Sequence, residues 1–82
     1  MFTVYIIFSL TLNRYYIGYT NNIEKRMIDH IAGISSFTSK AIDWELKFTE
    51  DHPTRELAMK REKEIKNKKS RRYIEWLISS AG

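Results

Sequence analysis

Hydrophobic and polar positions along the chain predict three strands. Residues 2–8 are mostly β-branched or aromatic and carry no charge, which is typical of a buried strand, and residues 14–19 have the same character. Because only residues 9–13 separate these two runs, we expect an antiparallel hairpin. Residues 43–49 alternate polar and apolar side chains, which predicts a third strand with one buried face.

A first helix is expected directly after the hairpin. Polar residues 20–22 are competent N-caps. Ile23, Met27 and Ile31 then recur at the spacing of one helical face, which predicts an amphipathic helix of about ten residues. Gly33 is expected to end it.

The rest of the chain predicts a loop and two further helices. Residues 34–42 are polar and rich in serine, so we expect a loop there. Pro53 suits the first turn of a long helix that reaches about Lys66, and a shorter helix with a wide apolar surface restarts at Ser70. One stripe of the long helix comprises Leu57, Ala58, Arg61, Glu62 and Ile65. The order ββαβαα predicts a single α+β domain over residues 1–82, with a small, mainly antiparallel sheet.

Composition narrows the class of protein. The chain has 82 residues, of which 43% are hydrophobic, enough for one packed core without disulfides. With no cysteine and two histidines, a disulfide framework and a structural zinc site are excluded. The uncharged stretch at residues 2–13 is too short to span a bilayer and lacks the pattern of a signal peptide. We therefore expect a soluble, cytoplasmic protein without a membrane partner.

Positive charge is concentrated in the last third of the chain. The net charge is +4, and residues 53–82 hold nine Lys and Arg against four acids. The segment from Lys60 to Arg72 is either a solvated helix face or a surface that follows a phosphate backbone. For the second case, the expected nucleic-acid-binding residues are Lys60, Lys63, Lys66, Lys68, Lys69, Arg71 and Arg72.

Glu62 stands out on the long helix, because its spacing from Ala58 and Ile65 places it on the stripe that faces the core. A carboxylate there is costly unless it has a charged partner or a metal ion. One interpretation is a glutamate at the edge of the stripe that pairs with Lys66 or Lys69. The other is a metal ligand.

Arg26 and His30 lie one turn apart on the first helix, where their side chains could reach the same volume. Arginine suits phosphate, and histidine titrates near neutral pH. The alternative is a solvated pair on the helix surface.

Tyrosines crowd the hairpin at positions 5, 15, 16 and 19. Each either packs its ring with the hydroxyl at the rim or brings the hydroxyl to a site beside Arg26 and Glu62. Strand alternation turns Tyr15 and Tyr19 to the opposite face from Tyr16.

Several of these residues form an ordered series of motifs: Thr3-Val4-Tyr5, Tyr16-Ile17-Gly18, Arg26, His30, and the segment from Ala58 to Lys66 that contains Glu62. In this order and spacing the chain resembles the GIY-YIG endonuclease superfamily over nearly its whole length. It looks most like the small stand-alone bacterial members, which are related to the nuclease domain of the bacterial excision-repair incision subunit. Thr3 and Val4 stand where the family motif has glycine and isoleucine.

The resemblance implies a three-stranded antiparallel sheet flanked by helices, and a metal-dependent endonuclease that nicks DNA with low sequence specificity, with repair or recombination as its setting. RNA is not excluded as a substrate. The family's catalytic positions correspond to Tyr5, Tyr16, Arg26, His30 and Glu62.

Each matched residue has an implied role. Glu62 would hold one Mg²⁺ or Mn²⁺, and Arg26 would clamp a phosphoryl oxygen. Tyr5 is the candidate general base, although the pKa of its phenol must be lowered by a nearby cation. Tyr16 and His30 would orient the water or relay its proton. The alternative function is a nucleic-acid-binding module on the same fold, with little or no hydrolysis.

Overall fold

Three antiparallel strands form the sheet of the computed structural model, which describes residues 1–33 and 38–81. The strands are β1 (Phe2–Ser9), β2 (Arg14–Thr20) and β3 (Trp44–His52), in the order β2-β1-β3. The hairpin and the α+β order ββαβαα are confirmed. Because β2 lies at the edge of the sheet, its side chains and one side of its backbone are open to neighbouring elements.

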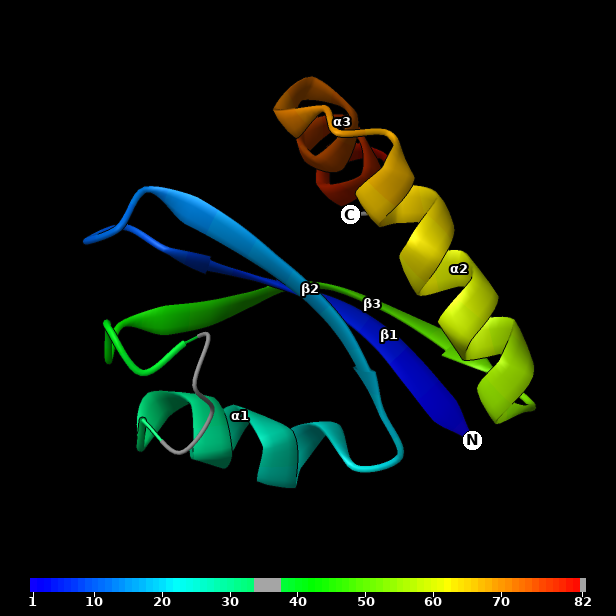
Figure 1. Ribbon diagram of the computed structural model, residues 1–82, viewed down its shortest axis with the longest axis horizontal. Helices are drawn as coiled ribbons and strands as arrows, with labels where there is room; N and C mark the ends of the chain where they lie inside the picture. The colour runs from blue at the N-terminus through cyan, green and yellow to red at the C-terminus, as the bar shows by residue number, and fades with distance from the viewer. Residues whose placement is uncertain (34–37, 82) are drawn as a thin grey trace.

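Three helices cover the two faces of the sheet. Helix α1 (Ile23–Ile31) lies on one side, and α2 (Arg55–Asn67) and α3 (Arg71–Ala81) lie on the other (Figure 1). Asn22 caps α1 by accepting a hydrogen bond from the Lys25 N–H, and Thr54 caps α2 in the same way. Pro53 therefore precedes the N-cap and lies outside the helix, not in its first turn as expected. Within the described part of the chain, no helix combines the length and the apolar composition needed to cross a membrane.

Strand alternation divides the core into two clusters. Val4 and Ile6 pack with Ala58 and Ile65 of α2. Tyr5 and Ile7 pack on the opposite face, which α1 covers, together with Tyr16 and Met27. Tyr15 and Tyr19 pack against the first cluster, so the expected separation of these two tyrosines from Tyr16 is present.

The prediction of one buried face on β3 is wrong. Trp44 packs on the α1 side of the sheet, whereas Phe48 packs on the α2 side. The register shifts between Ile6 and Ile7, which pair with Phe48 and Leu46, so one extra residue of β3 reverses the alternation. Leu46, which pairs with Ile7, is 43% exposed.

The predicted apolar stripe of α1 is also partly wrong. Ile23 and Met27 contact the core, but Ile31 is 45% exposed and His30 is fully buried in its place. The helix ends at Ile31, so the face at positions 23, 27 and 30 is the one directed at the sheet. On α2, Leu57 is likewise exposed.

Part of the predicted loop, residues 34–37, lies outside the described residues. The described remainder is not simply polar surface, because Thr38 and Ala41 are buried. Thr38 is held from both sides, since its carbonyl oxygen accepts a hydrogen bond from Trp44 Nε1 and its hydroxyl contacts His30. This segment therefore closes the space beside α1.

Candidate active site

A polar cleft of about 440 Å³ lies between β2, α1 and α2. Four of the five candidate catalytic residues line it, and the lining also includes a glycine and a second arginine: Tyr5, Tyr16, Gly18, Arg26, Arg55 and Glu62. His30 lies behind Tyr5, in contact with the phenol. The structure therefore brings together side chains from β1, β2, α1 and α2 that are up to 57 positions apart in the sequence.

Gly18 makes room for Tyr5. The two residues are directly paired across β1 and β2, and a Cβ atom at position 18 would lie 2.6 Å from the Tyr5 hydroxyl oxygen and 2.8 Å from its Cζ. No real Cβ atom tolerates such distances, so a side chain here would displace the phenol. This close approach explains why a glycine interrupts an otherwise bulky strand.

Tyr5 is buried and forms a close contact with His30. Its side chain is 1% exposed, and its hydroxyl lies 2.8 Å from His30 Nε2. Burial raises the pKa of Tyr5 to about 12, against the opposing effect of a hydrogen bond from the Arg26 guanidinium. The expected lowering of this pKa by a cation is therefore outweighed, and Tyr5 is a neutral phenol at neutral pH.

His30 is also neutral at neutral pH. Burial, and then the positive charge of Arg26, lower its pKa to about 4, while Asp29 acts in the opposite direction. Its second nitrogen, Nδ1, lies 2.7 Å from Thr38 Oγ1. A neutral imidazole has one donor and one acceptor nitrogen, so one of the two contacts uses it as a donor and the other as an acceptor.

Arg26 supplies one of the two fixed positive charges that line the cleft, together with Arg55. The pKa of Arg26 is raised, chiefly by hydrogen bonding to the Tyr5 hydroxyl and with a smaller contribution from Tyr16. The Tyr16 ring meets the His30 ring edge-on, with centroids 5.2 Å apart. The hydroxyls of Tyr5 and Tyr16 both interact with the guanidinium of Arg26.

Glu62 lines the cleft and forms an ion pair with Lys66. Its Oε1 lies 3.3 Å from Lys66 Nζ, and its side chain is 17% exposed, compared with 49% for the lysine. The predicted pairing with Lys66 is therefore present. Glu62 also presents its carboxylate to the cleft.

The donor set fits a weakly held divalent cation. Across residues 1–33 and 38–81, no group of three or more His, Asp or Glu side chains is placed to hold a metal ion. One carboxylate is nevertheless compatible with Mg²⁺, which keeps several waters and takes further oxygen ligands from phosphates. Glu62 would supply the protein ligand.

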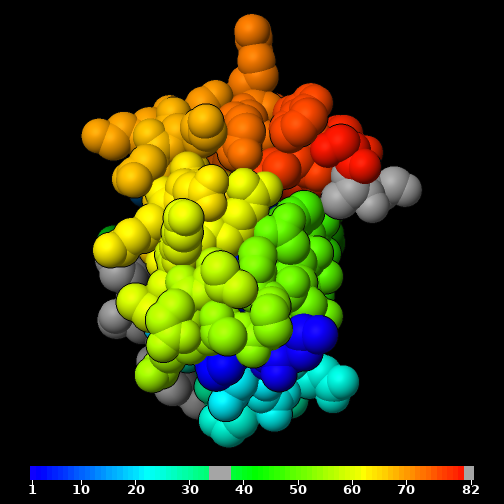
Figure 2. Space-filling model, turned by 90° about the vertical axis from the view of Figure 1, so that its right-hand side faces the viewer, coloured from blue at the N-terminus to red at the C-terminus, as the bar shows by residue number. Residues whose placement is uncertain are grey.

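The seven basic residues expected at nucleic acid lie on α2, on the turn that follows it and on the first turn of α3. Lys66, Lys69 and Arg71 line a second cleft. Lys60 and Lys63 are exposed on α2, whose outer face is open to solvent (Figure 2). The remaining two are Lys68, which lies 5.4 Å from the centre of the Tyr73 ring, and Arg72, which is exposed on α3.

Sequence reasoning missed two residues around the cleft. Arg55 lines it, and its spacing of seven residues from Glu62 places both on one face of α2, a signal that was available in the sequence. Thr38 contacts His30 from a segment without periodicity, so no sequence pattern indicates it.

A three-stranded sheet flanked by helices, with two tyrosines, an arginine and a glutamate around one cleft, defines a small nuclease-type α+β domain. The chain belongs to the GIY-YIG family, because the family model for the GIY-YIG catalytic domain matches residues 1–74. This is a nuclease family, whose members act on nucleic acid and generally use a divalent metal ion.

One solved structure supports the family assignment. The chain is similar to the solution NMR structure of the UPF0213 protein BH0048 from Bacillus halodurans, with 33% sequence identity and a TM-score of 0.63. The match covers 100% of this chain and 87% of that chain. No curated protein matches the sequence.

Proposed function

We propose that the protein is a divalent-metal-dependent endonuclease that hydrolyses phosphodiester bonds in DNA with low sequence specificity. The observation that carries this proposal is the convergence of Tyr5, Tyr16, Arg26 and Glu62 on one polar cleft. A binding site for phosphate alone gains nothing from a carboxylate, because like charges repel. The presence of Glu62 therefore favours hydrolysis over simple binding.

Arg26 and Glu62 have different electrostatic roles in this proposal, since Arg26 binds the phosphate and Glu62 binds the metal ion. Arg26 clamps a nonbridging oxygen of the scissile phosphate with a guanidinium that is already ordered by tyrosine hydroxyls. Glu62 supplies the metal ligand, and a bound Mg²⁺ or Mn²⁺ would neutralise the phosphoryl oxygens and the departing alkoxide.

Tyr5 and His30 accept the proton of the attacking water in two linked transfers. The Tyr5 oxygen accepts the proton from the water, and the hydroxyl proton of Tyr5 passes to His30 Nε2 across the 2.8 Å contact. This arrangement requires a neutral histidine with Nε2 free to accept, and the low pKa of His30 supplies the neutral form. Tyr16, at the mouth of the same cleft, orients the water.

A second candidate function is a nucleic-acid-binding module with little or no hydrolysis. One observation favours it, namely that Lys66 already neutralises the Glu62 carboxylate. In that case the cleft would bind a phosphate without needing a metal ion.

A cleavage panel separates the two functions. Duplex, nicked, branched and single-stranded DNA, together with RNA, are incubated with the protein in Mg²⁺, Mn²⁺ or EDTA. We expect metal-dependent cleavage that Glu62→Gln abolishes, with equal or tighter DNA binding by the variant because a negative charge is removed. Binding without cleavage of any substrate would establish the module instead.

A further inference from the structure

A second cleft, of about 430 Å³, lies where the β1–β2 hairpin meets the end of α2 and the start of α3. Its floor is apolar and includes Ile17, Ile65 and Ile74. Four cationic side chains line it as well: Arg14, Lys66, Lys69 and Arg71. None of the described residues that line this cleft is acidic, so it combines apolar contact with positive charge.

The second cleft continues the candidate active site along the same two elements. On α2, Lys66 follows Glu62 by one turn, about 6 Å along the helix axis. On β2, Arg14 precedes Gly18 by four residues, about 13 Å of strand. One nucleic-acid strand advances about 3.4 Å per nucleotide in a duplex, so the second cleft lies about two to four nucleotides from the first.

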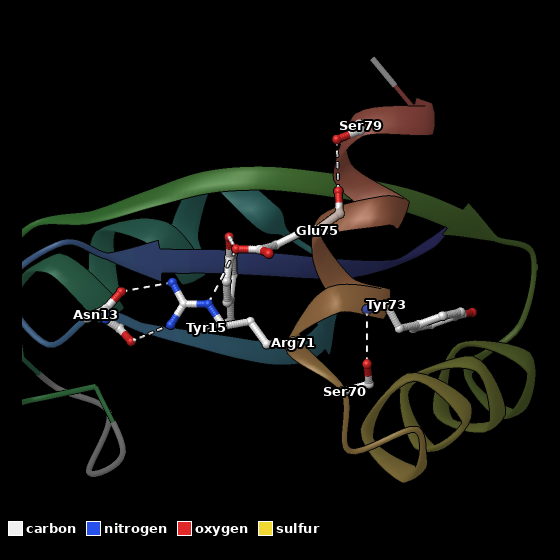
Figure 3. Close-up of polar contacts among 7 residues, drawn as sticks. All are labelled: Asn13, Tyr15, Ser70, Arg71, Tyr73, Glu75 and Ser79. Atoms are coloured by element: carbon white, nitrogen blue, oxygen red, sulfur yellow. Dashed lines mark hydrogen bonds and ion pairs between the residues drawn. The ribbon is translucent and has the colours of Figure 1, made fainter.

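Arg71 holds the wall of this cleft in place (Figure 3). Its guanidinium donates hydrogen bonds to the main-chain oxygen of Asn13 at 3.1 Å and to the side-chain oxygen at 2.8 Å, and it pairs with Glu75 at 3.3 Å. It also lies 5.2 Å from the centre of the Tyr15 ring. These contacts join the hairpin to α3. The positive charge of Arg71 is therefore largely compensated by groups of the protein itself.

Arg14 and Lys69 are the cations that remain available. Both are exposed, and within the described residues neither forms an ion pair. Lys69 has a left-handed backbone with φ 49°, a conformation that glycine or asparagine adopts more readily. Asn13, with φ 53°, is the other non-glycine residue with positive φ in the described chain, and it lines the same cleft.

We propose that this second cleft binds the sugar–phosphate backbone of the substrate strand about two to four nucleotides from the scissile phosphate. Arg14 and Lys69 each contact a phosphate, and the apolar floor contacts a sugar. The site fixes the register of the strand without reading its bases, because phosphate contacts carry no sequence information. This inference rests on the proposed endonuclease function, since it defines the second cleft relative to the first.

A pair of double variants tests the proposal. Arg14→Gln/Lys69→Asn removes the two available cations, and asparagine suits the left-handed backbone at position 69. The matched control, Lys40→Gln/Lys47→Gln, removes the same charge from exposed positions outside both clefts. Binding of a labelled DNA duplex is measured by fluorescence anisotropy in EDTA, over a range of salt concentrations.

We expect the cleft variant to raise the Kd about tenfold and to reduce the slope of log K against log salt by about 1.8, the value for two lost phosphate contacts. The control should stay within about twofold of the wild-type protein, because distant charges are screened by salt. Circular dichroism checks the fold. If the double variant unfolds, the single variant Lys69→Asn takes its place, and it should reduce the slope by about half as much.

Equal weakening by the two double variants would overturn the inference. Wild-type cleavage of DNA in the panel would still uphold the proposed function in that case. Conversely, selective loss of binding in the cleft variant, without cleavage of any substrate by the wild-type protein, would overturn the nuclease proposal and leave the second cleft as the backbone site of a binding module.

Discussion

The Tyr5 hydroxyl and His30 Nε2 lie 2.8 Å apart, both buried and both uncharged at neutral pH. The neutral phenol and the neutral imidazole are the resting state of the pair, because a proton passed to His30 leaves a buried imidazolium, which a low-dielectric site makes costly. The pair therefore connects the polar cleft to the interior, where Thr38 fixes the far side of the imidazole.

Tyr5→Phe should lower the single-turnover cleavage rate by about 10²-fold or more, because the proton acceptor is lost. It should also destabilise the fold by about 1–3 kcal/mol, since His30 Nε2 loses its buried partner. Quench-flow kinetics and urea unfolding measure the two effects. Tyr73→Phe is the matched control, because its ring packs against the core on the opposite face of the sheet and lines neither cleft. A fully active Tyr5→Phe protein would remove Tyr5 from the mechanism.

Stability should depend on pH through His30. Its pKa is 6.5 in the unfolded chain and about 4 in the folded protein, so the unfolded state binds more protons between these values. The neutral, buried form of His30 contributes fully to the free energy of unfolding above pH 6.5. This contribution is lost as pH falls through 4, and the total loss is about 3 kcal/mol. Urea unfolding at a series of pH values should show this loss in the wild-type protein. A His30→Gln protein with the same pH dependence would contradict the assignment.

Asp43 should govern a separate acid transition. Its carboxylate accepts hydrogen bonds from the Ser9 hydroxyl at 2.6 Å and from the Thr11 N–H and hydroxyl, and these contacts lower its pKa from 3.8 to about 2. The stabilisation is therefore present above pH 4 and lost as pH falls through 2. Asp43→Asn should melt below the wild-type temperature at pH 7, and the difference should vanish near pH 2. A difference that persists there would mean that the charge of Asp43 contributes nothing.

Gly18→Ala should displace Tyr5, because the new methyl group would lie 2.6 Å from the hydroxyl oxygen. We expect a loss of about 1–3 kcal/mol in unfolding free energy and a fall in cleavage. Since the contact is shared, the double variant Tyr5→Phe/Gly18→Ala should be less destabilised than the sum of the single variants. If the two changes in unfolding free energy are additive in the double variant, the side chain at position 18 does not clash with the Tyr5 hydroxyl.

Lys66→Met should tighten the binding of Mn²⁺, because the ammonium that pairs with Glu62 competes with the metal ion. An exposed ion pair of this kind is worth up to about 1 kcal/mol, which corresponds to about fivefold in Kd. Isothermal titration measures the affinity, with Lys60→Met, elsewhere on α2, as the control. If the Lys66 variant binds Mn²⁺ with unchanged affinity, Lys66 does not compete with the metal ion for Glu62.

Periodicity predicts much of this arrangement because it fixes the direction of side chains within each element. Alternation along β2 separates Tyr16 from Tyr15, and helical spacing aligns Glu62 with Ala58 and Ile65. The order of the elements follows from the same patterns. Periodicity therefore indicates the face on which each of these side chains lies, whereas their assignment to one site came from the resemblance to the GIY-YIG family.

What periodicity does not predict is set by contacts between elements. The extra residue opposite Ile6 and Ile7 depends on how β3 pairs with β1, and no local signal indicates it. The burial of His30 depends on Thr38, which follows it by eight residues in an aperiodic segment. The raised pKa of Tyr5 depends on burial by the assembled fold. Each of these features arises only in the tertiary structure.

The hydrogen bonds between Arg71 and Asn13 join residues 58 positions apart, so they exist only when α3 is docked on the hairpin. Tyr5, Arg26 and Glu62 all precede α3 in the chain, and none of them belongs to it. A molecule with α3 undocked would therefore keep the first cleft and lose a wall of the second. Docking of α3 thus also completes the surface along which a nucleic-acid strand would lie.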